Sequence, residues 1–251
     1  HYYHLLTVVA RRSGSTGNGD LVMITLLTFA PAFGQPAASP FCVKAMMLLN
    51  MAGVEWTPEY LSDPRKMPYS KLPAIRVNGE IIADSDNIRL WLEARGAEFN
   101  QGLTRAEMAY SRALIRMAEE HLYFHVGYDR WGDDAVWPTI RDTYFKDIPR
   151  PFRKFITGQI RKPVVTSFHQ MGILRFNPQE RLARAEPDLK AIADLLTGPF
   201  LFGEKPTAAD ACVAPQLAGM MSTPVATLLG DRVRGDKVLV DYVARVAEAT
   251  L

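Results

Sequence analysis

The chain has 251 residues, of which 48% are hydrophobic, and a formal net charge of +2 at pH 7. This composition argues against a disordered chain and allows one large domain or two modest ones. Lys and Arg are scattered and do not gather on one periodic face, so no electrostatic signature of a nucleic-acid-binding protein is present. The longest apolar runs are about ten residues, short of the roughly twenty that span a bilayer, so we expect no membrane span.

The two cysteines, Cys42 and Cys212, are too few for a disulfide framework, and no Cys/His spacing of a zinc site occurs. We therefore expect no metal and a reducing, cytoplasmic compartment. Residues 1–22 lack an initiator Met and end in SGSTGNGD, so we interpret them as a leader or non-native extension outside the fold. A remnant of a targeting peptide is the alternative, since Arg11 and Arg12 occur there with a single acid.

The first two predicted elements are a strand and a helix. MITLLTF at 23–29 has the β-branched and aromatic content of a buried strand. SPFCVKAMMLLNMAG then predicts a helix that Ser39 caps, with Pro40 at its first position and Gly53 at its end.

Two further strand patterns and a helix follow. VEWTPEYL at 54–61 predicts a second strand, and AIRV and EIIA predict a hairpin around Asn78-Gly79, a dipeptide that tolerates positive φ. Ser85 is expected to cap a helix that closes at Gly96. The order predicts an α/β domain over 23–97 with a mixed four-stranded sheet.

Beyond Gly102 only helical patterns occur, broken by Pro and Gly, and they predict an all-helical domain over 103–249. The expected helices are 103–127, 136–146, 150–171, 178–197, 207–221 and 236–249.

This order of elements, with SPFC at a helix start, KLPAI before the hairpin, ADS after it and GEKPTAADACVAP in the helical part, resembles the glutathione transferase superfamily. Within it, the loop FAPAFGQPAASPFCVKAMMLLNMAG is most similar to the metaxin and failed-axon-connections branch and its bacterial relatives. The resemblance implies a thioredoxin-like N-terminal domain, an all-α C-terminal domain and glutathione as co-substrate at their junction. It leaves a homodimer open.

The resemblance also implies the glutathione-binding residues. A cis peptide before Pro73 would present the backbone of Leu72 to the cysteinyl amide of glutathione, with a trans proline at the strand start as the alternative. Asp84 and Ser85 would hold the γ-glutamyl end, because a helix N-terminus offers N–H groups to a carboxylate and Asp84 can meet the α-ammonium. Both could instead be ordinary caps. Lys71 would meet the glycyl carboxylate or be a solvated charge.

Two residues near the start of the first helix are candidates for catalysis. The Ser39 hydroxyl could donate to the glutathione sulfur at a helix N-terminus and favour the thiolate, or it could only cap the helix. Ser39 takes the first position of the C-P-x-C pattern, so a dithiol mechanism is unavailable at this turn. Cys42 is either a thiol of lowered pKa or a buried, inert one.

The loop 30–38 has no hydroxyl, although many transferases carry a catalytic Tyr or Ser directly after the first strand, so catalysis does not follow from the fold. The second-substrate pocket is expected where this loop faces the first long helix of the helical domain. On that helix His121, Phe124, Tyr128 and Trp131 fall at spacings of three and four. A core stripe is the alternative to a pocket.

Three functions compete. The preferred one is a detoxifying transferase that conjugates the glutathione thiolate to a small apolar electrophile, because KLPAI and ADS keep a ligand site. The alternatives are a non-catalytic, metaxin-like interaction protein and a glutathione-dependent thiol reductase that uses Cys42.

Overall fold

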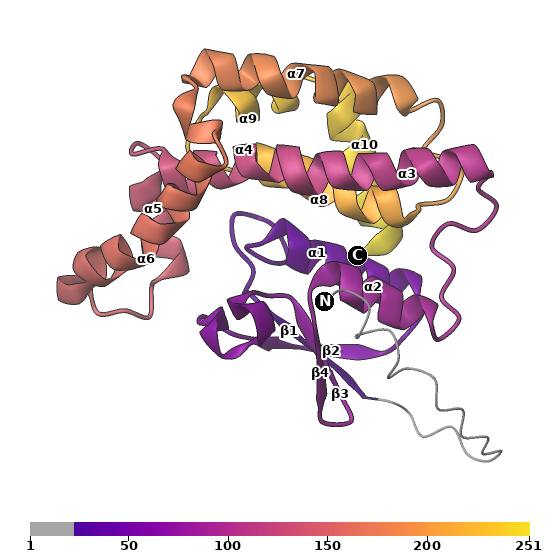
Figure 1. Cartoon of the computed structure of the whole chain (residues 1–251), viewed down its shortest axis with the longest axis horizontal. Coiled ribbons are helices and arrows are strands. Elements are labelled where there is room, and N and C mark those ends of the chain that lie inside the picture. Colours follow the sequence, from indigo (N-terminus) through magenta and orange to yellow (C-terminus); the bar gives the residue numbers. More distant parts are fainter. Residues whose placement is uncertain (1–22) are drawn as a thin grey trace.

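The computed structural model describes residues 23–251 (Figure 1), so the predicted leader at 1–22 lies outside the described residues. Four strands form one sheet in the order β2-β1-β3-β4. They are β1 (Ile24–Thr28), β2 (Trp56–Tyr60), β3 (Ala74–Val77) and β4 (Glu80–Ala83).

The sheet is mixed, as the sequence predicted. β1 pairs in parallel with β2 and antiparallel with β3, and β3 pairs antiparallel with β4. The β3-β4 hairpin turns at Asn78 and Gly79, whose φ angles of 49° and 84° are both positive. That is the conformation a tight two-residue hairpin requires, which explains the choice of Asn-Gly.

Helices α1 (Pro40–Met51) and α2 (Ser85–Glu93) lie between the sheet and the helical domain (Figure 1). α1 is buried from both sides, with Ala45, Leu48 and Leu49 all fully inaccessible. Its N-cap is Ser39, but the Ser39 side chain makes no capping hydrogen bond. The predicted cap of α2 is wrong by one residue, because Asp84 is the N-cap and Ser85 is the first helical residue.

The helical domain contains eight α-helices within the described residues. They are α3 (Arg105–Met117), α4 (Tyr123–Gly127), α5 (Trp137–Tyr144), α6 (Arg150–Gln170), α7 (Pro178–Leu195), α8 (Ala208–Met221), α9 (Leu228–Arg234) and α10 (Lys237–Thr250). The sequence missed α9, whose seven residues with a glycine at the centre are too short for a clear period. Apart from one β-bridge between Phe200 and Gly203, the described part of 103–251 holds no strand. No helix among the described residues is both long enough and apolar enough to cross a membrane.

Two π-helical segments extend the first long helix of this domain. Residues 118–122 join α3 to α4, and residues 128–132 continue the helix beyond Gly127. A π turn holds more residues than an α turn, so side chains after it rotate to a different face. The simple 3–4 spacing of the sequence therefore does not predict which side chains share a face here.

Helix α8 is the centre of the helical domain, and every residue from 208 to 220 is buried. Asp210 holds its N-terminus, since Oδ2 accepts hydrogen bonds from the backbone and the hydroxyl of Thr207, both at 2.8 Å. Its Oδ1 accepts from Leu201 N at 3.0 Å and from the hydroxyl of Tyr242 in α10, also at 3.0 Å. One buried carboxylate therefore ties α8 to α10 and to the preceding loop.

A buried ion pair joins the two domains. Lys44 Nζ of α1 lies 2.6 Å from Glu119 Oε1 of the long helix and 3.5 Å from Asp86 Oδ1 of α2. Burial alone would raise the pKa of Asp86, but Lys44, Arg89 and Arg116 lower it to about 2. Opposite charges on α1, α2 and the long helix thus hold these three helices in one relative position.

Replacing Lys44 with Met should destabilise the fold by about 3–5 kcal/mol, because buried Glu119 loses its 2.6 Å partner and keeps only Arg116 at 3.8 Å. The double variant Lys44→Met/Glu119→Leu should recover most of this loss. Urea unfolding followed by circular dichroism measures the difference. Lys237→Met is the matched control, since it breaks an exposed pair with Asp241 and should cost at most about 1 kcal/mol. Equal losses for Lys44→Met and Lys237→Met would contradict this role of the buried pair.

Candidate functional site

Three chain segments that carry predicted site residues meet at one edge of the sheet. The register places Leu27 beside Ala74 and Ala74 beside Ala83, so β1 and β4 end where β3 begins. Asp84 N donates to Pro73 O at 3.1 Å, which links the start of β3 directly to the N-cap of α2. The candidate glutathione site therefore lies on a rigid edge and not on a free loop.

The peptide bond between Leu72 and Pro73 is cis, as the resemblance implied. Neither the N–H nor the C=O of Leu72 makes a backbone hydrogen bond within residues 23–251. Leu72 therefore offers one donor and one acceptor to an extended peptide at the start of β3.

Asp84 and Ser85 have different roles at the N-terminus of α2: Asp84 caps the helix, and Ser85 does not. Asp84 Oδ1 accepts from Asp86 N at 2.8 Å and from Asn87 N at 3.3 Å, so the cap is satisfied by one oxygen of this carboxylate. Neither the hydroxyl nor the N–H of Ser85 forms a hydrogen bond within residues 23–251. The residue is 3% exposed, but its hydroxyl oxygen is not among the inaccessible ones that lack a partner, so a ligand can reach it. These two donors are available to a carboxylate, and Asp84 Oδ2 is available to an ammonium group.

Lys71 precedes Leu72 and is exposed. It forms no ion pair with the rest of the described chain, 23–251. Its charge is therefore solvated in the free protein and accessible to an anionic group at the sheet edge.

The structure decides between the two interpretations of Cys42. The side chain is fully buried, and burial raises the pKa of the thiol even though Thr28, Phe29 and Ser39 lie in contact with the sulfur. The hypothesis that the helix N-terminus lowers the pKa of Cys42 is wrong, because desolvation outweighs the helix dipole. Ser39 is half-buried and makes no capping hydrogen bond, and its side chain lies against the Cys42 sulfur.

The predicted second-substrate stripe does not face the loop 30–38 as a unit. Three of its four members pack against α6 and α7 instead. His121 Nδ1 is 2.6 Å from Asp188 Oδ2, the Phe124 ring is 6.0 Å from that of Phe168, and Arg181 stacks 3.5 Å from the Tyr128 ring. For these three residues the core alternative fits the packing, and the π segments explain why spacing pointed elsewhere.

Trp131, the fourth member, belongs to an aromatic cluster that does reach the loop. Its ring lies 5.1 Å from that of Trp137 and 6.3 Å from that of Tyr144. The Tyr144 ring lies 5.7 Å from that of Phe33, which comes from the loop itself. The loop is thereby anchored against α5.

Sequence reasoning missed the residues that actually hold the loop. Arg130 Nη1 donates to Ala38 O at 2.8 Å and to the Tyr144 hydroxyl at 3.0 Å, and Arg130 Nη2 donates to Gly219 O at 2.9 Å. Tyr123 packs edge-on against Phe41 at 4.8 Å. Tyr123 and Arg130 lie next to the predicted stripe in the sequence, but nothing in its composition indicated which face meets the first domain.

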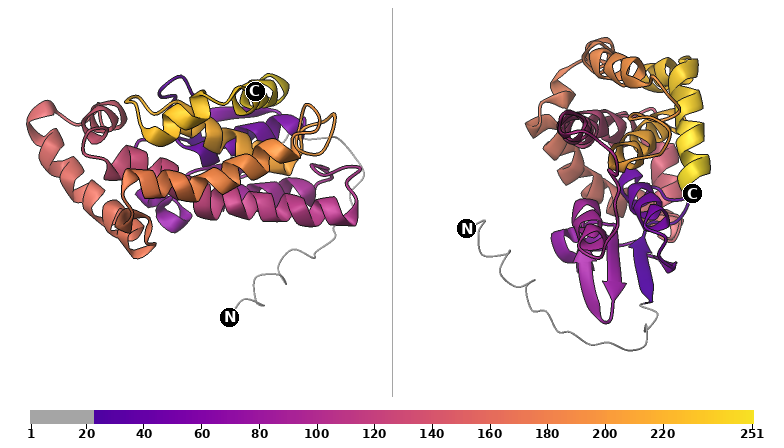
Figure 2. Two further views of the ribbon diagram at one scale, coloured as in Figure 1. Left: turned by 90° about the horizontal axis from the view of Figure 1, so that it is seen from above. Right: turned by 90° about the vertical axis from the view of Figure 1, so that its right-hand side faces the viewer.

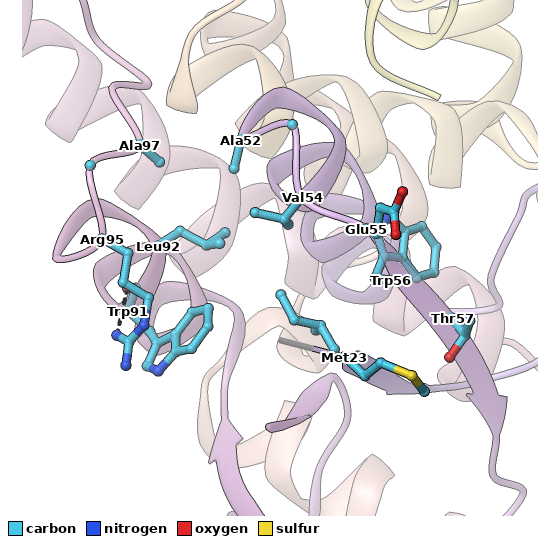
Figure 3. A pocket seen from close by; sticks show the side chains of 13 residues that line it. Met23, Ala52, Val54, Glu55, Trp56, Thr57, Trp91, Leu92, Arg95 and Ala97 are labelled. Carbon is cyan, nitrogen blue, oxygen red and sulfur yellow. Dashed lines mark hydrogen bonds between the residues drawn. The ribbon is translucent and has the colours of Figure 1, made fainter. Parts of the chain in front are cut away.

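Two cavities lie away from this sheet edge. One, of about 1140 Å³, opens between the starts of β1 and β2 and the end of α2 (Figure 3). Figure 3 shows Arg95 lying over Trp91, with Met23, Val54 and Trp56 across the cavity. The other, of about 460 Å³, lies between the loop and α1, α8 and α10. Neither is lined by Ser39, Pro73 or Ser85.

Within 23–251, no three His, Cys, Asp or Glu side chains are grouped to hold a metal ion.

Comparison with known families gives two matches. Residues 40–136 match the glutathione S-transferase N-terminal domain, and residues 185–246 match the glutathione S-transferase C-terminal domain. Together these ranges contain the site edge, the long helix and α8.

Several curated proteins are similar over most of the chain. Isoprene-epoxide–glutathione S-transferase of Rhodococcus sp. (strain AD45) is 28% identical over 236 residues, which cover 89% of this chain and 98% of the relative. Failed axon connections of Drosophila melanogaster is 27% identical over 77% of this chain and 49% of its own length. Human metaxin-2 is 23% identical over 76% of this chain and 72% of its own length.

Solved structures share the fold. A glutathione S-transferase from Ascaris lumbricoides superposes with a TM-score of 0.52 at 18% identity, covering 90% of this chain and 92% of the other. Glutathione transferase Omega 3C from Trametes versicolor gives 0.53 at 15% identity, covering 89% and 84%. These likenesses confirm the predicted thioredoxin-like sheet domain followed by an all-helical domain.

The thiol of Cys42 should react slowly with iodoacetamide in the folded protein at pH 7.5, because it is buried and its pKa is raised. We expect at least about a hundredfold faster labelling in urea, measured by mass spectrometry of the intact chain and its peptides. Lys190→Cys is the matched control, since an exposed thiol on α7 should label rapidly without denaturant. Fast labelling of Cys42 in the folded protein would contradict this prediction and support the thiol reductase function.

Proposed function

The chain belongs to the glutathione S-transferase superfamily, and from that premise we propose that it binds glutathione at the sheet edge and adds the glutathione thiolate to a small apolar electrophile. The observation that carries this proposal is the pair of unpartnered donors on Ser85, beside the free backbone of Leu72. Both donors lie at the N-terminus of α2, where unpaired N–H groups and the positive end of the helix dipole favour an anionic group.

The polar groups of the site follow the same order along the sheet edge as the groups of glutathione that they would bind. The γ-glutamyl carboxylate would accept from the Ser85 hydroxyl and N–H at the positive end of α2, while Asp84 Oδ2 would pair with the α-ammonium. The cysteinyl amide would exchange two backbone hydrogen bonds with Leu72, as an added antiparallel strand does. Lys71 would meet the glycyl carboxylate.

The sulfur would then lie toward the N-terminus of α1, where the helix dipole and the Ser39 hydroxyl favour the thiolate. The thiolate attacks an electrophilic carbon and forms a carbon–sulfur bond while the bond to the leaving atom breaks. With an epoxide, the ring oxygen leaves as an alkoxide and takes a proton from solvent. An epoxide is our first choice of electrophile because the Rhodococcus relative is named for one and matches along 98% of its length.

An interaction protein without chemistry is the second candidate, supported by the similarity to Failed axon connections and metaxin-2. The thiol reductase is disfavoured by the burial of Cys42. Calorimetric titration with glutathione, followed by a turnover assay with a small epoxide, separates these functions. Binding with turnover supports the transferase, and no binding up to millimolar glutathione would overturn it in favour of the interaction protein.

Ser85→Ala should weaken glutathione binding by about 1–3 kcal/mol, the range for a lost hydrogen bond to a charged group. Because Asp84 and not Ser85 caps α2, the melting temperature should change little. Titration calorimetry and thermal unfolding measure the two quantities. Ser111→Ala is the matched control, since this buried hydroxyl of α3 also lacks a partner among the described residues but lies outside the site. An unchanged affinity for Ser85→Ala would remove Ser85 from the site.

Ser39→Ala should lower kcat with a model electrophile by about ten to a thousandfold, since one donor to developing thiolate charge is worth roughly 1.4–4 kcal/mol. Stability should change little, because the side chain makes no capping bond. Steady-state kinetics and the pH at which bound glutathione ionises report the effect. Unchanged turnover would instead assign thiolate stabilisation to the backbone N–H groups of α1.

A further inference from the structure

Helix α6 has a face that the proposed glutathione chemistry does not use. α5 and α6 lie at one end of the molecule, where α7 also begins, in both Figure 1 and Figure 2. With 21 residues, α6 is the longest uninterrupted α-helix among the described residues.

One face of α6 fastens it to the end of the long helix. Phe168 lies so close to Gly127 that a Cβ on that glycine would come within 2.6 Å of the Phe168 ring. About two turns earlier Arg161 donates to Trp131 O at 2.6 Å, and about three turns earlier Thr157 is completely buried. Residues 157, 161 and 168 share one face at spacings of four and seven.

The opposite face is apolar and turned to solvent. Four large side chains at spacings of three and four form a continuous ridge along the N-terminal half of α6. They are Phe152, Phe155, Ile156 and Ile160, exposed by 63%, 73%, 39% and 38%. Contiguous apolar ridges of this kind mark interaction surfaces in proteins that are not membrane-spanning.

The helix is also strongly basic. It carries five Lys and Arg and no Asp or Glu, in a chain whose net charge is only +2. Arg153 and Arg161 are engaged with Asp142 and Asp134. The other three, Arg150, Lys154 and Lys162, are exposed and form no ion pair with any residue of the described chain, 23–251.

We propose that α6 docks this protein onto an anionic membrane surface. The phenylalanine ridge would enter the headgroup boundary, and Lys162, seven residues after Phe155 on the same side of the helix, would meet lipid phosphates. Arg150 and Lys154 lie toward the side that carries Thr157 and would strengthen the attraction to an anionic surface at longer range. A second copy of the chain fits less well, because α6 paired with itself would bring unpaired cations together without an acid on either helix. The inference is independent of glutathione binding.

Vesicle flotation with the full chain tests this proposal, using phosphatidylcholine vesicles with and without about 30% phosphatidylserine, an anionic lipid. We expect at least about tenfold stronger partitioning to the anionic vesicles, falling at least about fivefold when NaCl rises from about 50 to about 300 mM. Phe152→Ser/Phe155→Ser should reduce partitioning at least about tenfold, and Lys154→Glu/Lys162→Glu by a similar factor.

Each variant has a matched control. Met108→Ser/Tyr110→Ser removes two apolar side chains of α3 that are 48% and 61% exposed, and Lys190→Glu/Lys205→Glu reverses two exposed cations elsewhere. Both controls should partition like the native protein, and thermal unfolding should show all four variants folded. Equal partitioning to neutral and anionic vesicles, or equal losses in variant and control, would overturn the proposal. A fall in molar mass for Phe152→Ser/Phe155→Ser, with unchanged vesicle binding, would assign the ridge to contact between copies instead.

Discussion

The buried pair between Lys44 and Glu119 is the interaction on which the arrangement of this protein depends. Lys44 lies one turn inside α1, the helix whose N-terminus carries Ser39, and Glu119 lies in the π segment of the long helix. Two opposite charges that exclude water tolerate little displacement, because separating them leaves each one desolvated and unpaired. The distance between the sheet edge and the helical domain is therefore set by charge and not only by apolar packing.

The candidate site is made of donors placed by backbone geometry, with few titratable groups. The strand ends bring Leu72 close to the N-cap of α2. Because Asp84 caps this helix, the Ser85 side chain is not needed as a cap. Arg130 and Tyr144 both bond to Ala38 O, so the loop before Ser39 is held from the helical domain. A site of this kind recognises a peptide-like ligand by hydrogen bonds to its two ends. The reactive group is then the sulfur of the ligand and not a side chain of the protein.

The α6 ridge and the sheet edge are physically separate. α6 is fastened through Arg161 and Phe168 to the far end of the long helix, and its free side carries no residue of the glutathione site. A surface attachment through α6 would leave the sheet edge uncovered (Figure 1). The two proposals can therefore hold or fail separately.

The sequence by itself determined what depends on local chemistry. Asn78-Gly79 predicts its hairpin because few other residues tolerate two positive φ angles, Pro40 and Gly53 bound α1, and KLPAI with ADS indicates the family. The tertiary structure decided what depends on burial and on the faces of helices. It buried Cys42 and so raised its pKa, it made Asp84 the cap, and its π segments turned His121, Phe124 and Tyr128 toward α6 and α7. Desolvation and helix rotation are set by neighbours distant in sequence, which no local pattern contains.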